Sequence, residues 1–141
     1  MALTSAIGHD EDVARFLSDE WLAQLNHAVA ADERASTAAA GIHLVIQQVV
    51  VADDRDQIRY ATRVDDGRVW VEPGPAEDAH VTITEDYDTA TALAQGATTP
   101  QDAILAGKVR VRGDVGALLK GQEVLERVRA CYDDVRAHTE Y

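Results

Sequence analysis

The side chains of this chain that are best suited to chemistry are five histidines and a single cysteine. No histidine has a partner at a zinc-binding spacing such as H-x-x-x-H or H-E-x-x-H. His43 and His80 lie in strand-like segments and could meet across neighbouring strands, but a pair of histidines cannot complete a zinc site. The sequence therefore predicts no metal site. These two histidines, together with the carboxylates, are the candidates if the protein is a small enzyme acting on an apolar substrate.

Other reactive side chains give no catalytic pattern. Asp53, Asp54 and Asp56 lack the central glycine and the distal glutamate of a calcium-binding loop, so they predict a solvated turn. Cys131 falls on a mostly apolar helix face, which favours a buried thiol over a nucleophile. The glycines form neither a phosphate loop nor a dinucleotide fingerprint, and no serine occupies a nucleophile elbow. We expect no catalytic residue, no cofactor and no enzymatic activity.

The charge balance excludes some partners. With 13 basic and 25 acidic residues the net charge is −12, and nucleic-acid binding or strong attraction to an anionic membrane needs a cationic surplus. No apolar run approaches the roughly 20 residues of a membrane span, so stable membrane insertion is not expected. The polar, acidic start does not resemble a signal peptide, and one cysteine suits a reducing compartment. A cytoplasmic location is therefore expected.

Hydrophobic periodicity divides the chain into elements. Residues 1–12 are expected to be a flexible N-terminus, followed by one domain over 13–141. Glu11–Asp32 has helical spacing, although Ser18 could instead cap a separate helix that starts at Asp19. Residues 31–40 are expected to be a link of small residues. Alternation and β-branched residues then predict strands, with a hairpin turn at Asp65-Asp66-Gly67; the strands cover 42–51, 57–64, 68–72 and 79–84.

Short helices and one strand follow. Thr84 or Asp86 is expected to cap a helix that stops at Gly96, and Thr99 to cap a second helix over 100–106. Residues 108–112 alternate as a strand with a cationic outer face, which suits a sheet edge. A last helical region follows Asp114, and Gly121 is expected to interrupt it. The whole pattern predicts an α+β fold with an antiparallel sheet and helices on one face.

Trp70 is the exposed position that stands out. Alternation places Val69 and Val71 inward and Trp70 on the opposite face of the sheet. A tryptophan there marks an interface or is covered by a loop or by the N-terminal segment. Both interpretations remain open from the sequence.

An ordered motif occupies the stretch from Ala79 to Lys120. A strand of the type A-x-V-T-I-T is followed by a helix and Gly96, then by a proline-started helix that ends A-x-x-x-G-K. An alternating strand leads from there into the glycines of Gly113-Asp114-Val115-Gly116. In this order and spacing the chain resembles the SCP-2-like (sterol carrier protein 2) family.

The resemblance implies a five-stranded, mostly antiparallel sheet with helices packed on one face and an apolar tunnel between them. It also implies ligands such as sterols, fatty acids, fatty acyl-CoA esters or phospholipids, and no metal or redox cofactor. By position, the implied ligand-binding residues are Val81, Ile83, Leu93, Ile104, Leu105, Val109, Val111, Leu118 and Leu119. Trp21, Leu25 and Tyr60 are expected to be plain core.

The resulting hypothesis is non-catalytic binding, or transfer, of an apolar lipid-type ligand in that tunnel. The alternative is an SCP-2-like interaction or accessory module without a ligand of its own. Trp70 and the C-terminal residues 122–141 motivate that alternative, because either could form a homodimer contact. The acidic composition favours a soluble binder over a carrier that works at anionic membranes.

Overall fold

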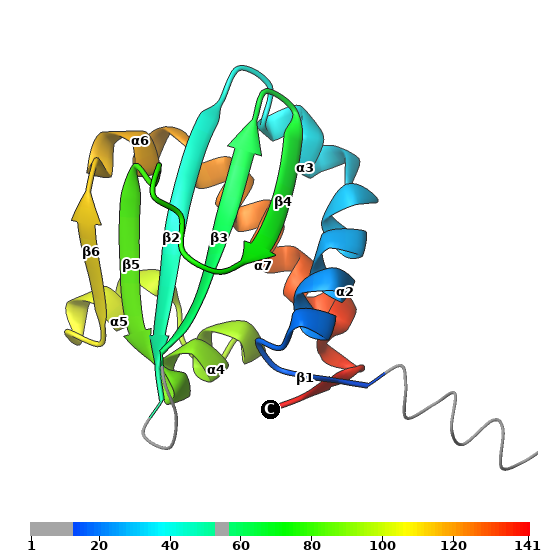
Figure 1. The fold of residues 1–141 in the computed structure, drawn as a ribbon, viewed down its shortest axis with the longest axis vertical. Helices are drawn as coiled ribbons and strands as arrows, with labels where there is room; N and C mark the ends of the chain where they lie inside the picture. The colour runs from blue at the N-terminus through cyan, green and yellow to red at the C-terminus, as the bar shows by residue number, and fades with distance from the viewer. Residues whose placement is uncertain (1–12, 53–56) are drawn as a thin grey trace, which may run out of the picture.

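A computed structural model describes residues 13–52 and 57–141. The expected flexible segment 1–12 and the Asp53–Asp56 turn lie outside the described residues. One sheet of five strands dominates the molecule (Figure 1), in the order β4-β3-β2-β5-β6. Its strands are β2 (His43–Val51), β3 (Ile58–Asp65), β4 (Arg68–Pro73), β5 (Val81–Asp86) and β6 (Val109–Gly113).

The sheet is mixed but mostly antiparallel. β2 runs parallel to β5, and the other three pairs are antiparallel. The helices lie behind this sheet and along its β4 edge in Figure 1, and the loop from β4 to β5 crosses the opposite face. The predicted α+β fold, with a five-stranded mostly antiparallel sheet and helices on one face, is confirmed.

β2 lies at the centre of the sheet because its residues suit both faces. Leu44, Ile46 and Val50 are buried, while Gln47 on the other face is held by the crossing loop. The Gln47 amide donates to the Gly74 carbonyl, and its oxygen accepts from the Ala76 N–H. A buried amide of this kind needs such partners, since an unsatisfied polar group costs free energy in the interior.

The hairpin between β3 and β4 follows the sequence prediction. Asp66 and Gly67 both have positive φ, of 43° and 95°. That combination is the type I′ turn, whose twist matches two antiparallel strands and which favours Asp-Gly.

The N-terminal helix is shorter than the spacing over Glu11–Asp32 suggested. α2 spans Asp19–Ala30, and the Ser18 hydroxyl accepts from the Trp21 N–H, so the alternative start at Asp19 is confirmed. Residues before Ser18 instead form β1 (Ala14–Arg15), which pairs in parallel with β7 (Thr139–Glu140). Pairing with the distant C-terminus overrides the local helical periodicity there.

The link expected over 31–40 contains a helix. α3 spans Glu33–Ala38, and the Asp32 carboxylate accepts from the N–H groups of Arg34 and Ala35. The same carboxylate pairs with Arg127 at 2.7 Å. The N-cap and the long-range ion pair therefore stabilise a helix in this segment, which the many small residues had suggested was a connecting link.

α2 also protects one edge of the sheet. The Asn26 amide donates to the Val71 carbonyl at 2.7 Å, and the Val71 N–H donates to the Asn26 oxygen at 2.6 Å. Asn26 thus satisfies backbone groups of β4 that an edge strand would otherwise leave open to another chain.

The C-terminal half follows the predicted order of helices. α4 (Tyr87–Gln95) is capped by Asp86, and α5 (Pro100–Leu105) is capped by Thr99. α6 (Val115–Lys120) is capped by Asp114 and ends at Gly121, where α7 (Gln122–Arg136) begins. A Cβ on Gly121 would lie 2.5 Å from Leu44 Cδ2, so close packing against β2 explains the glycine at the predicted break.

α7 crosses the helical side of the sheet (Figure 1) and closes the core. Its buried face consists of Val124, Val128, Cys131 and Val135. Aromatic side chains from both ends of the described chain meet in the same core, where Phe16 contacts Trp21 at 4.9 Å and Tyr141 at 5.1 Å between ring centroids. The C-terminal residues are therefore part of the core.

Candidate functional site

A pocket of about 410 Å³ lies between the helical side of the sheet and helices α4 to α7. Its volume falls in the range of small-molecule sites, which run from about 300 to 1,000 Å³. Apolar side chains from both layers make up most of its lining. From the sheet side these are Ile46, Ile83, Val109 and Val111; from the helices they are Ala90, Leu93, Ile104, Leu118, Leu119, Leu125 and Val128.

Strand register explains why the sheet side is continuous. Gln48 is paired in register with Tyr60 on one side and Ile83 on the other, and Ile83 is paired with Val111. One row of side chains thus runs across four strands and points toward the helices. A second row includes Glu85, which is paired with Val50 and with Val109.

The helical side of the pocket includes its most exposed apolar residues. Ile104 on α5 and Leu119 on α6 line the pocket, and their relative exposures are 48% and 64%. Leu93, Leu118 and Leu125 are half-buried. The lining therefore includes both buried side chains and side chains that contact solvent. The solvent-exposed ones lie on α5 and α6, so these two helices form the rim of the pocket.

The structure brings together seven of the nine residues implied by the resemblance: Ile83, Leu93, Ile104, Val109, Val111, Leu118 and Leu119. Val81 and Leu105 lie outside the lining. Val81 is 1% exposed and packs in a core cluster with Leu44, Ile46 and Val124. Leu105 is 86% exposed at the end of α5.

Sequence reasoning missed several lining residues. Trp21, Leu25 and Tyr60 all belong to the buried core, as expected, and Tyr60 also lines the pocket. α7 also contributes to the lining, through Gln122, Leu125, Glu126, Val128, Arg129 and Tyr132. The helical periodicity of these residues predicts that one face of α7 is buried. It does not predict whether that face packs against other side chains or lines a pocket.

Glu85 is another missed residue, and the sequence did carry a signal for it. The alternation of Val81 and Ile83 continues to position 85, beyond the predicted strand end at Thr84. The side chain is 9% exposed and lines the pocket. Burial, with a smaller effect of the neighbouring Asp86 carboxylate, raises the pKa of Glu85 to about 7.

Two tyrosines accompany Glu85. The Tyr60 and Tyr132 hydroxyls interact with each other across the sheet–helix interface. Burial raises the pKa of Tyr132 to about 12 and that of Tyr60 well above its ordinary value, with the nearby Glu85 charge acting in the same direction. Both phenols are therefore neutral hydrogen-bonding groups at physiological pH.

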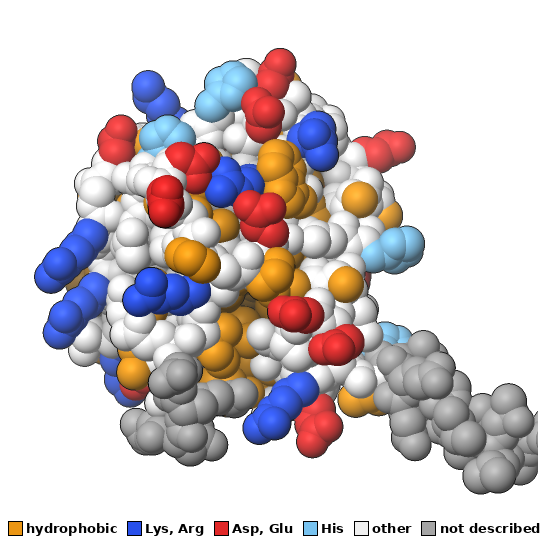
Figure 2. Space-filling view, viewed as in Figure 1, with side chains coloured by type: hydrophobic (Ala, Val, Ile, Leu, Met, Phe, Trp, Pro, Cys, Tyr) orange, Lys and Arg blue, Asp and Glu red, His pale blue; other side chains and the backbone are white. Residues whose placement is uncertain are grey.

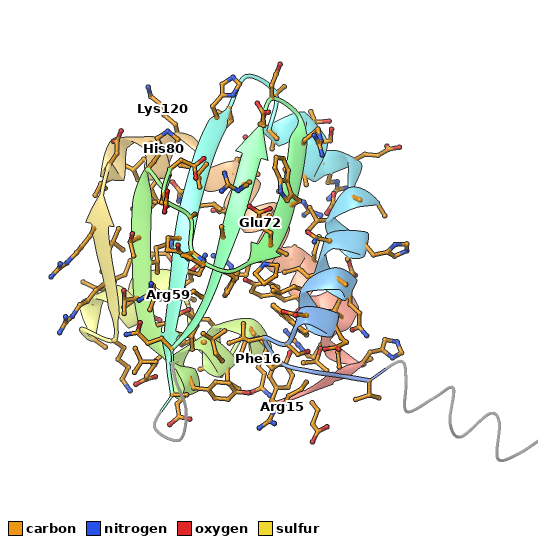
Figure 3. All side chains as sticks on the ribbon, viewed as in Figure 1. Arg15, Phe16, Arg59, Glu72, His80 and Lys120 are labelled. Atoms are coloured by element: carbon orange, nitrogen blue, oxygen red, sulfur yellow. The ribbon has the colours of Figure 1, made fainter. Side chains whose placement is uncertain are left out.

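The histidines considered for catalysis lie elsewhere. His80 precedes β5 at the end of the sheet opposite Phe16 (Figure 3), and its Nδ1 accepts from the Val45 N–H at 3.0 Å. His43 pairs with Asp65 at 2.9 Å and is exposed. Neither histidine lines the pocket. Within residues 13–52 and 57–141, no group of three metal-ligating side chains is positioned to hold an ion.

Cys131 is buried in the core, as the sequence predicted. Its thiol donates to the Asp32 carboxylate at 3.5 Å. Burial, followed by that carboxylate, raises the pKa of Cys131 to about 11. A thiol that stays protonated and buried is a poor nucleophile.

A second hollow lies between α2, α3 and α7, but its chemistry differs. It is a broad open depression, and the Asp32–Arg127 ion pair is part of its lining. His27, Glu33 and Asp134 add further polar groups. A surface with this lining does not suit an apolar ligand.

Charged side chains lie next to Trp70 on its face of the sheet. The Arg68 guanidinium lies 4.7 Å from the Trp70 ring centroid, and the indole N–H donates to Glu72 at 3.4 Å. Acidic, basic and apolar side chains are interspersed on this face (Figure 2). Among the described residues, no helix combines the length and apolar character that a membrane crossing requires.

Comparisons with known proteins agree with this geometry. The model of the SCP-2 sterol transfer family matches residues 22–126. A crystal structure of sterol carrier protein 2 has a TM-score of 0.69 and 17% identity, covering 83% of this chain and 96% of that one. The apo form of sterol carrier protein 2 from Yarrowia lipolytica has a TM-score of 0.61 and 15% identity, covering 79% and 88%.

A third solved structure is the palmitated SCP2L2 protein from Aedes aegypti. Its TM-score is 0.54 and its identity 18%, covering 73% of this chain and 90% of that one. Among curated proteins, none has a sequence that matches this chain. At these identities the solved structures show a shared fold, while the family match spans most of the described residues. The chain belongs to the SCP-2 sterol transfer family, whose members are in general non-catalytic domains that bind or transfer lipids.

Proposed function

We propose that this protein binds, and by exchange transfers, one apolar lipid-type molecule in the pocket between its sheet and helices α4 to α7. The observation that carries the proposal is the pocket itself, about 410 Å³ with a mostly apolar lining. A packed core would leave no such volume, because interiors normally contain few voids larger than a water molecule.

The energetics suit an apolar ligand held without many polar contacts. Burying a methylene contributes about 0.8 kcal/mol, so a chain of twelve to sixteen carbons gains on the order of 10 kcal/mol. Lost translational and rotational freedom and ordering cost several kcal/mol of that gain. We expect micromolar binding with modest selectivity for chain shape.

The exposed rim supports entry from the α5–α6 side. Ile104 and Leu119 are apolar, partly exposed and part of the lining. A lipid can therefore contact apolar surface before it is fully enclosed. Sterols, fatty acids and fatty acyl-CoA esters are the ligand classes that we propose, by analogy with the family and with the palmitated fold neighbour.

We propose that residues 13–141 form one domain that acts without catalysis. Three of the side chains considered for chemistry, His43, His80 and Cys131, lie outside the pocket lining. A cytoplasmic location remains a prediction that rests on the single cysteine and the acidic composition.

The alternative, an interaction module that dimerises through Trp70 or the C-terminal helix, receives no support. The apolar face of α7 is already buried in the core. Arg68 and Glu72 occupy the neighbourhood of Trp70. Both surfaces proposed for a dimer are therefore engaged within the chain.

Titration of the purified protein with a fluorescent sterol, a fluorescent long-chain alcohol and a fluorescent fatty acid tests the proposal. Ile83→Phe extends a ring into the pocket and should weaken binding several-fold, because the ring takes up space that the ligand would use. Leu105→Gln is the matched control outside the lining and should leave affinity unchanged. The proposal fails if no probe binds saturably, or if Ile83→Phe binds as well as the unaltered protein.

A further inference from the structure

Glu85 is a carboxyl group in a mostly apolar pocket. The side chain is 9% exposed and comes from the last inward position of β5, with Val50 and Val109 beside it in register. In the part of the chain that the structure describes, no hydrogen bond or ion pair is made to its carboxylate. A buried carboxyl group without a partner is costly, so native structures rarely keep one unless something binds it.

The surroundings of Glu85 offer it no compensating charge. Gln48 and the tyrosine pair lie in the same lining and are neutral. The charged or titratable groups that line this pocket or act on Glu85 are Tyr60 from β3, Asp86 from β5, and Glu126, Arg129 and Tyr132 from α7. Two of these are further carboxylates, and Arg129 makes no ion pair with Glu85. No histidine is among the described residues that line the pocket.

We propose that Glu85 is the headgroup subsite of the pocket and selects lipids whose polar group donates a hydrogen bond, a hydroxyl or a protonated amine, against lipids that carry a carboxylate. A hydroxyl or ammonium inserted toward β5 would satisfy the buried carboxyl group. A ligand carboxylate in the same place would bring two like charges together in a poorly solvated site. An apolar tail there would leave Glu85 unsatisfied. This inference rests on the proposed lipid-binding function and narrows its ligand class.

The charge on Glu85 gives the subsite a pH signature. Because the pKa of this carboxyl is raised to about 7, it gains a full negative charge between about pH 6 and pH 8. An alkylammonium resembles a lysine ammonium and stays protonated throughout this range, and an alkyl carboxylate stays ionised. The affinity for the amine should therefore rise with pH, that for the carboxylate should fall, and that for the alcohol should change little.

Competition binding with three ligands of equal chain length tests this directly. Dodecan-1-ol, dodecylamine and dodecanoate would each displace a bound fluorescent probe at pH 6 and pH 8. At pH 8 we expect dodecanoate to bind at least tenfold more weakly than dodecan-1-ol. Between pH 6 and pH 8 we expect a several-fold gain for dodecylamine and a several-fold loss for dodecanoate.

Two variants separate the subsite from general electrostatics. Glu85→Gln keeps the shape and removes the charge, so both pH trends and the bias against dodecanoate should disappear. Glu123→Gln is the matched control, because Glu123 is an exposed carboxylate of α7 outside the pocket lining, and it should keep both trends. The opposed pH trends of the unaltered protein test the inference even if Glu85→Gln is unstable.

The outcomes also distinguish this inference from the function on which it rests. Binding of all three ligands with flat pH profiles, a preference for dodecanoate at pH 8, or unchanged trends in Glu85→Gln would overturn the subsite and leave lipid binding standing. Failure of every ligand and probe to bind would overturn the proposed function and the subsite together.

Discussion

At the scale of single residues, Glu85 links the pocket to the stability of the fold. A carboxyl group buried beside Val50 and Val109 is more easily kept protonated than ionised. In the unfolded chain the same group ionises near its ordinary pKa of 4.5. The residue that suits a ligand headgroup therefore weakens the ligand-free protein at neutral and alkaline pH.

The sign of this effect gives a prediction. Between pH 4.5 and about 7 the folded protein holds a proton that the unfolded chain has already lost, so the contribution of Glu85 to stability falls as pH rises and is fully lost above about pH 7. The shift corresponds to about 3 kcal/mol. Urea unfolding at pH 5 and pH 8.5 should show this loss in the unaltered protein and a smaller one in Glu85→Gln.

Glu126→Gln serves as the control for that measurement, since it removes an exposed carboxylate from the same pocket lining. Its pH dependence should match that of the unaltered protein. Equal pH dependence in the unaltered protein and in Glu85→Gln would show that Glu85 does not titrate differently on folding.

At the scale of elements, the strands of the sheet could be predicted from the sequence, but the helices and the strand pairing could be predicted only in part. Alternation and the Asp-Gly turn predicted β3 and β4, and side-chain caps predicted where α4 and α5 begin. α3 was missed because its stability comes from Asp32, whose partner Arg127 is far away in the sequence. The parallel pairing of β2 with β5, and that of β1 with β7, also depends on contacts that no local pattern reveals.

The pocket was predictable to a similar degree. The family resemblance correctly named seven residues of the lining. Continuing the alternation of Val81 and Ile83 along β5 by two more residues would have added Glu85. The contribution of α7 could not be predicted, because the same apolar periodicity describes Val124 in the packed core and Leu125 at the pocket. Only the position of the helix over the sheet separates the two.

Two neighbouring positions of β5 give a prediction at this scale. Val81 and Ile83 share one face of the strand, but Val81 is fully buried outside the pocket lining and Ile83 is part of that lining. Val81→Phe should cost about 1 to 3 kcal/mol of unfolding free energy, because over-packing forces its neighbours apart. Ile83→Phe should cost less than about 1 kcal/mol, since the pocket accepts the ring.

Chemical denaturation of both variants checks this difference. An equal loss of stability would mean that the space beside Ile83 is not available to a side chain. The comparison is internal, because both changes place the same ring on the same strand and face.

At the scale of the whole molecule, both edges of the sheet are protected. The Asn26 side chain hydrogen-bonds to the backbone of β4. At the other edge, β6 carries the exposed side chains of Arg110 and Arg112. Basic side chains project at the edge of the molecule where β6 lies (Figures 1 and 2). These features, with the buried face of α7, favour a protein that acts through its interior rather than through strand pairing with another chain.

Methyl-resolved NMR of protein labelled at isoleucine, leucine and valine, titrated with dodecan-1-ol, tests the central claim of an internal lipid site most directly. We predict saturable shifts and ligand contacts for the methyl groups of Ile83, Leu93, Val109 and Leu118, with little change at Leu22 and Leu25 in the core beside α2. Contacts confined to the open depression between α2, α3 and α7, or no contact with any methyl group, would contradict the claim.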